Sequence, residues 1–175
     1  MEGPPQTQLS SSKELGRRGY ANARSKSFTK KPKDQQISEE MARLFLDQIH
    51  LEKEVEKLKC DLAHRIDFTC LNAWQLFNYR GLEAMTMSEF SESLYSYIGN
   101  RFYDRDQSYL IFKRYDADMD GRINYREWCR LIIPTDRVLS SLLLGRSPPV
   151  NTRLSNDTQE VFKRLMRAHL NLEQA

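Results

Sequence analysis

The stretch Asp116–Glu127, with the sequence DADMDGRINYRE, limits what this chain can fold into more than any other feature. An aspartate stands at every second position, a glycine follows, and a glutamate closes the stretch. Carboxylates this close repel one another unless a cation lies between them or water screens them. Two interpretations are therefore open: a loop wrapped around a hard cation, or a solvated acidic turn.

The stretch fills every slot of a calcium-binding loop that joins two helices. Gly121 stands where that loop needs a positive φ, which glycine adopts with the least strain. Ile123 supplies the apolar residue for a short β-bridge to a partner loop. The predicted ligands are the carboxylates of Asp116, Asp118 and Asp120, the backbone carbonyl of Arg122, Asn124 beside a water ligand, and both oxygens of Glu127. We therefore expect one Ca²⁺ site, for which Mg²⁺ is a candidate occupant at rest.

A second loop of the same kind is expected at residues 78–89, because such helix–loop–helix units occur in pairs. Met85 then takes the apolar slot and faces Ile123 across the bridge. However, Arg80 stands where a ligand belongs, and Glu83 stands where glycine is expected. We predict that this loop keeps the scaffold but does not bind calcium.

Helical segments surround both loops. The predicted helices are 68–77 capped by Asp67, 87–98 ending at Gly99, a helix capped by Asp104 or Asp106 that ends at Tyr115, 125–133, a short helix from Asp136 to Gly145, and a last helix capped by Asn156 with Gln159 that ends near Glu173. The last helix has an apolar face made of Val161, Phe162, Leu165, Met166, His169 and Leu172. The predicted fold class is therefore all-α.

Residues 37–66 are predicted to form one long amphipathic helix that starts at Ser38. Seam positions recur there at alternating spacings of three and four, and the apolar ones are Met41, Leu44, Leu51, Val55, Leu58 and Leu62, with Gln48 in the polar position. Such a heptad pattern occurs in coiled-coil dimers, and also in long helices that pack on their own domain or on a partner. We favour the second interpretation, because the pattern is short and Gln48 interrupts it.

Residues 1–36 differ in composition from the rest of the chain. Residues 1–35 hold eight basic and three acidic side chains, whereas the whole chain has a formal net charge of only +3. With few large apolar residues, such a segment cannot offset its ordering entropy and is predicted to be disordered on its own. The expected organisation is a basic disordered arm (1–36), the long helix (37–66), the paired loops (67–134) and a helical C-terminal extension (135–175).

Two long stretches of the sequence resemble a known family. LEKEVEKLKCDLAHRIDFTCLNAWQLFNYRG and FKRYDADMDGRINYREWCRLIIPTD resemble EF-hand proteins of the calmodulin superfamily. They are most similar to EF-hand proteins that are numerous in protists, especially ciliates, and that carry a Glu/Lys-rich helix before the hand pair. The resemblance covers about residues 38–173 and implies a paired EF-hand domain whose first hand is degenerate and whose second is complete. It also implies calcium binding and a cytoskeletal or ciliary setting.

The expected function is calcium binding by a non-catalytic structural or regulatory component of a cytoskeletal or axonemal assembly on ciliary microtubules. The basic arm would contact an acidic protein surface such as tubulin. Nucleic acid is a less favoured partner, because the arm has only Tyr20 and Phe28 as aromatic residues. The alternative is a soluble calcium sensor, or a regulatory subunit that binds a target helix of an enzyme.

Several function classes are not supported by the sequence. The chain has no phosphate-binding glycine-rich loop and no hydrolase motif, so we do not expect an enzyme. No apolar run is long enough to span a bilayer. The three widely spaced cysteines are typical of reduced thiols, which indicates the cytoplasm. The resemblance to ciliate EF-hand proteins implies a location on the cytoskeleton or in a cilium axoneme.

Overall fold

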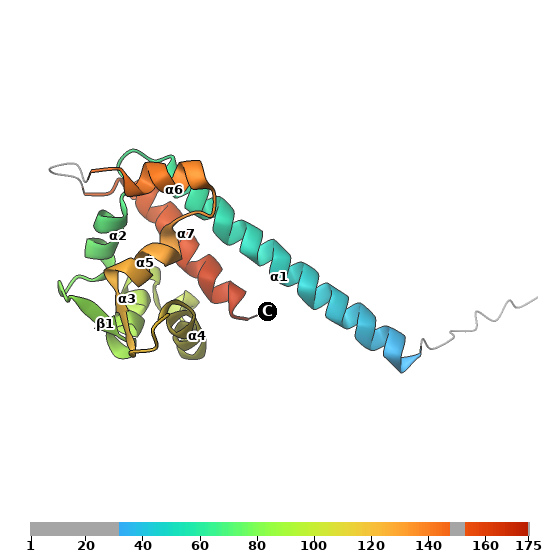
Figure 1. Ribbon diagram of the computed structural model, residues 1–175. Coiled ribbons are helices and arrows are strands. Elements are labelled where there is room, and N and C mark those ends of the chain that lie inside the picture. The colour runs from blue at the N-terminus through green and yellow to red at the C-terminus, as the bar shows by residue number, and fades with distance from the viewer. Residues whose placement is uncertain (1–31, 148–152, 175) are drawn as a thin grey trace, which may run out of the picture.

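The computed structural model describes residues 32–147 and 153–174, and nearly all regular structure in these ranges is helical (Figure 1). The elements in chain order are α1 (Lys33–Ala63), α2 (Cys70–Phe77), β1 (Ala84–Thr86), α3 (Met87–Ile98), the 3₁₀ turn η1 (Asn100–Phe102), α4 (Arg105–Tyr115), β2 (Arg122–Asn124), α5 (Tyr125–Ile132), α6 (Arg137–Leu144) and α7 (Asn156–Leu172). The predicted all-α class is confirmed, with one small two-stranded sheet. Residues 1–31 of the predicted arm lie outside the described residues.

Two helix–loop–helix units follow one another along the chain, and the sheet joins them. The first unit is α2–β1–α3 and the second is α4–β2–α5. β1 pairs antiparallel with β2, and Met85 lies opposite Ile123. Both side chains are buried in the core, which fixes the register of this short bridge. The predicted contact between the two loops is therefore confirmed.

Local capping sets several helix boundaries. Asp104 accepts a hydrogen bond from Gln107 N (2.9 Å) at the start of α4, as predicted. Asp136 caps α6 in the same way, through Leu139 N (2.9 Å). α3 ends at Gly99, whose φ of 84° lies in the region that favours glycine.

Two predicted caps are wrong. Thr69 rather than Asp67 caps α2, and Ser155 rather than Asn156 caps α7. The carboxylate of Asp67 accepts hydrogen bonds from Ser155 N and Thr158 Oγ1, both at 2.8 Å. Asp67 therefore joins the α1–α2 connection to the first turn of α7, a long-range contact that its sequence neighbours do not reveal.

α1 begins earlier and ends earlier than the predicted range 37–66. It starts at Lys33, directly after Pro32, whose carbonyl accepts a hydrogen bond from Gln36 N (3.1 Å). Proline has no N–H to donate, so a helix tolerates it only at its start. Ser38 is not a cap, because its hydroxyl donates to Asp34 O (2.9 Å) inside the helix. Residues 33–36 of the predicted arm are therefore helical.

α7 packs between α1 and the two helix–loop–helix units. Its predicted apolar face is buried along its whole length. The ring of Phe162 meets those of Phe68, Tyr97 and Trp128, at centroid separations of 5.8, 5.2 and 6.1 Å. α7 thus shares one core with the paired units.

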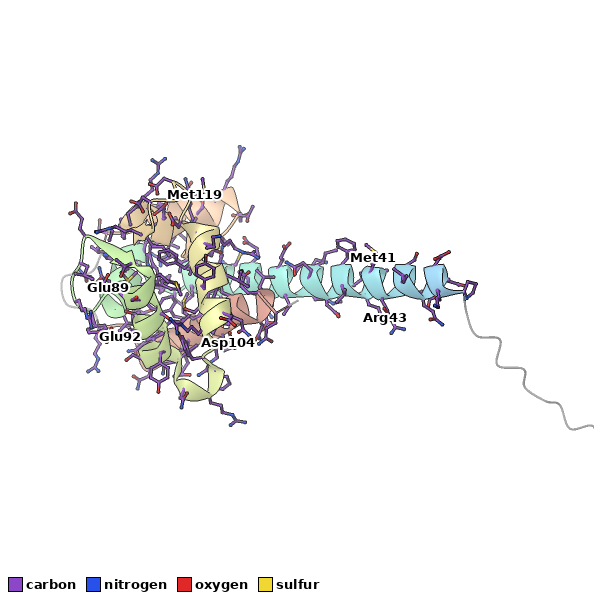
Figure 2. All side chains as sticks on the ribbon, turned by 90° about the horizontal axis from the view of Figure 1, so that it is seen from below. Met41, Arg43, Glu89, Glu92, Asp104 and Met119 are labelled. Atoms are coloured by element: carbon purple, nitrogen blue, oxygen red, sulfur yellow. The ribbon has the colours of Figure 1, made fainter. Side chains whose placement is uncertain are left out.

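The two halves of α1 have different surroundings. Val55, Leu58 and Leu62 are buried, because this half packs on α7 and α6. Figures 1 and 2 show the first half projecting away from the body, and Met41 and Arg43 lie on opposite sides of it. Packing of the long helix on its own domain is therefore confirmed for the second half.

Arg146, just after α6, ties this part of the chain to the α1–α2 connection. Its guanidinium donates to the carbonyl oxygens of Ala63 (2.7 Å), Phe68 (2.8 Å) and Arg65. Helix ends leave carbonyls without intrahelical partners. One side chain therefore satisfies several carbonyls where the chain leaves α1 and turns toward α2.

The described residues bear on two further predictions. None of their helices combines the length and the apolar character needed to cross a membrane. Cys60, Cys70 and Cys129 are all free thiols, as predicted. Cys70 on α2 and Cys129 on α5 share a hydrogen bond, which lowers the pKa of Cys129 to about 7 and raises that of Cys70.

Candidate metal centre

The loop between α4 and α5 brings three of the predicted ligands together. Carboxylate oxygens of Asp116, Asp118 and Asp120 all lie within 4.8 Å of one another. Asp116 is partly buried, and the other two are exposed at the loop surface. Three negative charges at this separation repel, and a divalent cation between them would convert that repulsion into attraction.

The backbone of the loop holds these carboxylates in place. Asp116 accepts hydrogen bonds from Asp120 N and Gly121 N, both at 3.1 Å. This wrapping needs left-handed backbone conformations, and Gly121 has a φ of 79°. Met119 also has a positive φ, 59°, and its side chain points into solvent at the edge of the body (Figure 2).

Glu127 does not belong to the group of three clustered carboxylates, although it shares a hollow with Asp118. Its side chain is 4% exposed at the start of α5. One oxygen accepts from Ala117 N (2.8 Å) and Asp118 N (3.4 Å), and the other accepts from Asn124 N (3.1 Å). The carboxylate of Glu127 therefore already binds backbone N–H groups of the loop. To act as a metal ligand, it would have to exchange these contacts for the metal ion.

Arg122 and Asn124 lie on β2, which closes the loop before α5. Arg122 pairs with Thr86 in the sheet, and its side chain is exposed. Asn124 Oδ1 accepts from Glu127 N (3.1 Å), which completes a reciprocal capping box at the start of α5. Sequence reasoning assigned Asn124 to a water ligand and missed this capping role, although the Asn-x-x-Glu spacing signals it.

The donor atoms in this loop fit a hard divalent cation. Every predicted side-chain ligand offers oxygen, which Ca²⁺ and Mg²⁺ prefer to nitrogen or sulfur. Among the described residues, the Asp116–Asp120 cluster is the only group of three or more potential metal-binding side chains this close together. The Asp116–Asp120 cluster could therefore hold a hard divalent cation, and the calcium or magnesium site stays a prediction.

The loop between α2 and α3 is held by its own side chains. Asn78 is buried and bonds to Leu82 in both directions, donating to its carbonyl (2.5 Å) and accepting from its N–H (3.1 Å). Arg80 pairs with Glu92 on α3 (2.8 Å) and so stays at the surface. The positive φ falls at Gly81 (66°), not at the predicted glycine slot of Glu83.

Glu89, the counterpart of Glu127 in this first loop, caps α3. Its carboxylate accepts from Thr86 N (2.9 Å) and Thr86 Oγ1 (2.8 Å). The bond from the Thr86 N–H is the main reason why the pKa of Glu89 lies below its ordinary value. Glu89 and Glu92 lie on α3 (Figure 2), and no metal-binding cluster forms in this loop.

α7 contacts both helices that flank the acidic loop, through His169. His169 Nε2 lies 3.0 Å from Leu131 O on α5, and Nδ1 lies 3.4 Å from the hydroxyl of Tyr115, which directly precedes Asp116. A carbonyl can only accept, so Nε2 carries the hydrogen and Nδ1 accepts from Tyr115. Burial lowers the pKa of His169 to about 3, and the ring is neutral at pH 7.

No protein-family model, curated protein or solved structure matches this chain. The interpretation of the acidic loop therefore depends on its own residues and their geometry.

Proposed function

We propose that this chain is a non-catalytic calcium-binding protein with a paired EF-hand domain, in which the α4–α5 hand binds one Ca²⁺. The observation that carries the proposal is the convergence of the Asp116, Asp118 and Asp120 carboxylates within 4.8 Å. Glu127, the Arg122 carbonyl and Asn124 would complete the set of oxygen ligands. The bound cation would neutralise the loop and tie α4 to α5, and Mg²⁺ would hold the site when calcium is low.

The first hand supports the proposal in a different way. Its loop joins the second through the Met85–Ile123 bridge, which is the contact expected between two hands. Its own side chains make the contacts that a cation would otherwise organise, as Asn78 does with Leu82. We therefore infer that this hand is a scaffold that aligns the second loop and binds no calcium.

The position of α7 favours a structural role over a sensor. A calcium sensor signals by exposing an apolar groove for a target helix. Here the apolar face of α7 already lies against the core of the hand pair, and Phe162 packs on Trp128. We infer that calcium stabilises an arrangement that is already closed, rather than opening a binding surface.

The cytoskeletal part of the proposal comes from the family resemblance and from the charge of residues 1–36. A basic segment attracts acidic surfaces, and the tubulin surface of an axonemal microtubule is one such partner. α1 begins at Lys33, so removal of residues 1–31 leaves every described helix intact. Deletion of residues 1–31 therefore tests the arm without changing the calcium-binding loop.

Calorimetric titration of the full chain with CaCl₂ tests the metal site. We expect one binding event, with a dissociation constant near 10⁻⁵ M or weaker, because the neighbouring hand contributes no second ion. Asp116→Ala should weaken binding at least tenfold. Asp118→Asn should do the same while preserving the exposed, polar character of the loop.

Glu89→Gln is the matched control, because Glu89 holds the equivalent position in the first hand and should not alter calcium affinity. Absence of binding heat at millimolar calcium would refute the proposal, and so would unchanged affinity in both aspartate variants. The structural role predicts little change in Trp74 and Trp128 fluorescence and no new binding of an apolar dye on saturation. A large increase in dye binding would favour the sensor.

Cosedimentation with stabilised microtubules tests the basic arm. The full chain should pellet with microtubules at low salt, and the chain lacking residues 1–31 should stay in the supernatant with its calcium affinity unchanged. Equal pelleting of both chains would show that the arm is not the anchor.

A further inference from the structure

The projecting half of α1 carries an apolar stripe that no described residue covers. The stripe consists of Ile37, Met41, Leu44 and Phe45, whose side chains are 52–64% exposed. Met41, Leu44 and Phe45 line a shallow hollow together with Gln48. Exposed apolar side chains that line up on one face of a helix are typical of a surface that another helix covers.

This stripe continues an interface that the molecule already uses. The same row of α1 carries Val55, Leu58 and Leu62 farther along, and these side chains are buried against α7 and α6. α7 runs antiparallel to α1, because Asp157 at its start pairs with Arg65, and Leu172 at its end lies near Ile49.

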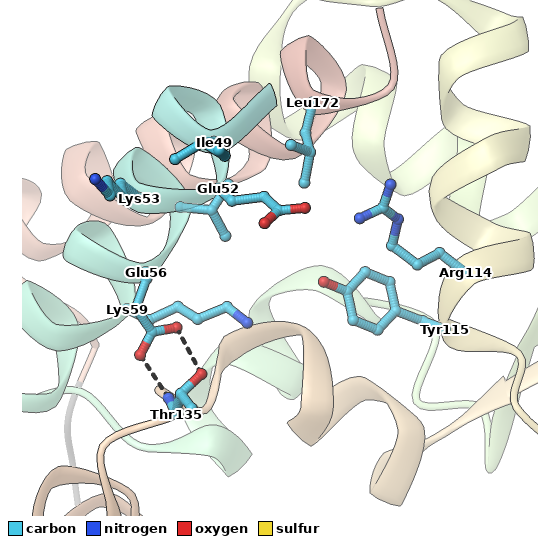
Figure 3. A pocket seen from close by; sticks show the side chains of 10 residues that line it. Ile49, Glu52, Lys53, Glu56, Lys59, Arg114, Tyr115, Thr135 and Leu172 are labelled. Carbon is cyan, nitrogen blue, oxygen red and sulfur yellow. Dashed lines mark hydrogen bonds between the residues drawn. The ribbon is translucent and has the colours of Figure 1, made fainter. Parts of the chain in front are cut away.

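Figure 3 shows the pocket where the end of α7 approaches α1. Ile49 and Val55 of α1 line one pocket together with Leu172, Tyr115 and Arg114. On the far side of the pocket, Glu56 accepts hydrogen bonds from Thr135 N and Thr135 Oγ1 (3.1 Å to the hydroxyl) and fixes α1 to the body. Beyond Ile49, toward the start of α1, the stripe runs on without α7.

The charges beside the stripe argue against a second copy of this chain as the occupant. In the heptad register of α1, the exposed residues Glu40, Asp47 and Glu54 line one flank. A parallel pair would place Asp47 opposite Glu52 of the other copy, and an antiparallel pair would place Glu40 opposite Asp47. Both arrangements set carboxylates against each other, and an anionic membrane would be repelled for the same reason.

We propose that the stripe of Ile37, Met41, Leu44 and Phe45, with Gln48 at its end, is the docking surface for a basic amphipathic helix of a partner protein. That helix would lie along α1 in line with α7 and would bury Met41, Leu44 and Phe45 under its apolar face. Its lysine or arginine side chains would meet Glu40 and Asp47. From Ile37 to Gln48 this surface spans roughly 17 Å, which corresponds to about three helical turns.

Fluorescence anisotropy of the full chain with a labelled synthetic peptide tests this proposal. The probe is an amphipathic peptide of about 20 residues in which leucines repeat in heptads between lysines. The comparison peptide has the same leucines between glutamates. We expect the lysine peptide to bind at least tenfold more tightly than the glutamate peptide, and its affinity to fall at high salt because surface charge pairs are screened.

Two matched variants locate the binding site. Leu44 and Leu46 are equally exposed, at 56% and 55%, but lie on opposite faces of α1. Leu44→Glu should weaken the lysine peptide at least tenfold, and Leu46→Glu should leave its affinity unchanged. Asp47→Lys should weaken the lysine peptide and strengthen the glutamate peptide.

Three outcomes would overturn the proposal. Equal losses in the two leucine variants would show that the peptide binds elsewhere. A dimer of the unmodified chain in sedimentation, dissociated by Leu44→Glu alone, would identify a second copy as the occupant. Binding to anionic lipid vesicles that Leu44→Glu abolishes would identify a membrane surface.

Discussion

Acidification should destabilise this fold through His169, because the buried ring cannot accept a proton without losing its contacts. His169 is 1% exposed, and its Nδ1 already accepts from the Tyr115 hydroxyl. Burial is the main cause that lowers its pKa to about 3, and the positive charges of Lys59 and Arg114 act in the same direction. In the unfolded chain the same ring titrates near its ordinary value of 6.5.

The sign and size of the effect follow from this difference in pKa. Between pH 6.5 and pH 3 the unfolded chain binds a proton at His169 and the folded chain does not, so stability falls as pH falls. Each pH unit in that window lowers the free energy of unfolding by about 1.4 kcal/mol. Lowering the pH to about 4.5 should therefore remove roughly 2–3 kcal/mol, and the full contribution is present above about pH 6.5.

Urea unfolding at pH values between about 4.5 and 7.5, followed by far-UV circular dichroism in the presence of EDTA, measures this effect. His169→Gln is the informative variant, because an amide can still donate to Leu131 O but does not titrate. The two stability profiles should diverge below about pH 6.5, with the wild type losing more. His50→Gln, at an exposed position on α1, is the control. Parallel profiles for wild type and His169→Gln would refute the reasoning.

Three further predictions concern stability, all measured by urea unfolding. Arg146→Ala should cost about 2–4 kcal/mol, since charged hydrogen bonds to several backbone carbonyls are lost, whereas Arg43→Ala on the projecting half of α1 should cost little; equal losses would contradict the role of Arg146. Leu58→Ala should cost roughly 2–5 kcal/mol and Leu44→Ala less than about 0.5 kcal/mol, although both lie on the same heptad seam of α1; a large loss at Leu44 would show that the stripe is covered within the chain. Burial raises the pKa of Asp67, but the hydrogen bonds it accepts from Ser155 and Thr158 outweigh burial and hold the pKa below its ordinary value. Asp67 therefore stabilises the fold fully above the ordinary pKa, and this stabilisation is lost as the pH falls through the lowered pKa. If the stability of Asp67→Asn falls in parallel with that of the wild type at acid pH, Asp67 makes no such contribution.

Sequence reasoning predicted the elements that depend on local pattern. The bridge between Met85 and Ile123, the caps at Asp104 and Asp136 and the buried face of α7 all follow from spacing along the chain. The three clustered aspartates also lie together because every second residue of a tight loop faces its centre. Glu127 was harder to place, because the cluster and the capping box compete for its carboxylate.

Features that depend on distant contacts were missed. Asp67 and Asn156 are good capping residues by composition, but Thr69 and Ser155 stand nearby and cap equally well. The carboxylate of Asp67 instead accepts hydrogen bonds from Ser155 N and Thr158 Oγ1, which are distant in sequence. The heptad pattern of α1 is nearly uniform, so it could not show which half of α1 packs on α7. That depends on the length of α7, which ends at Leu172.

The burial of α7 against the two helix–loop–helix units also sets a threshold for any competing helix. A covalently attached segment acts at an effective concentration on the order of millimolar. Suppose that α7 and a free helix have equal micromolar intrinsic affinity for this surface. The free helix would then bind the intact chain about a thousandfold more weakly than it would bind a chain without α7. Release or removal of α7, rather than the arrival of calcium, would then be the event that makes this surface available.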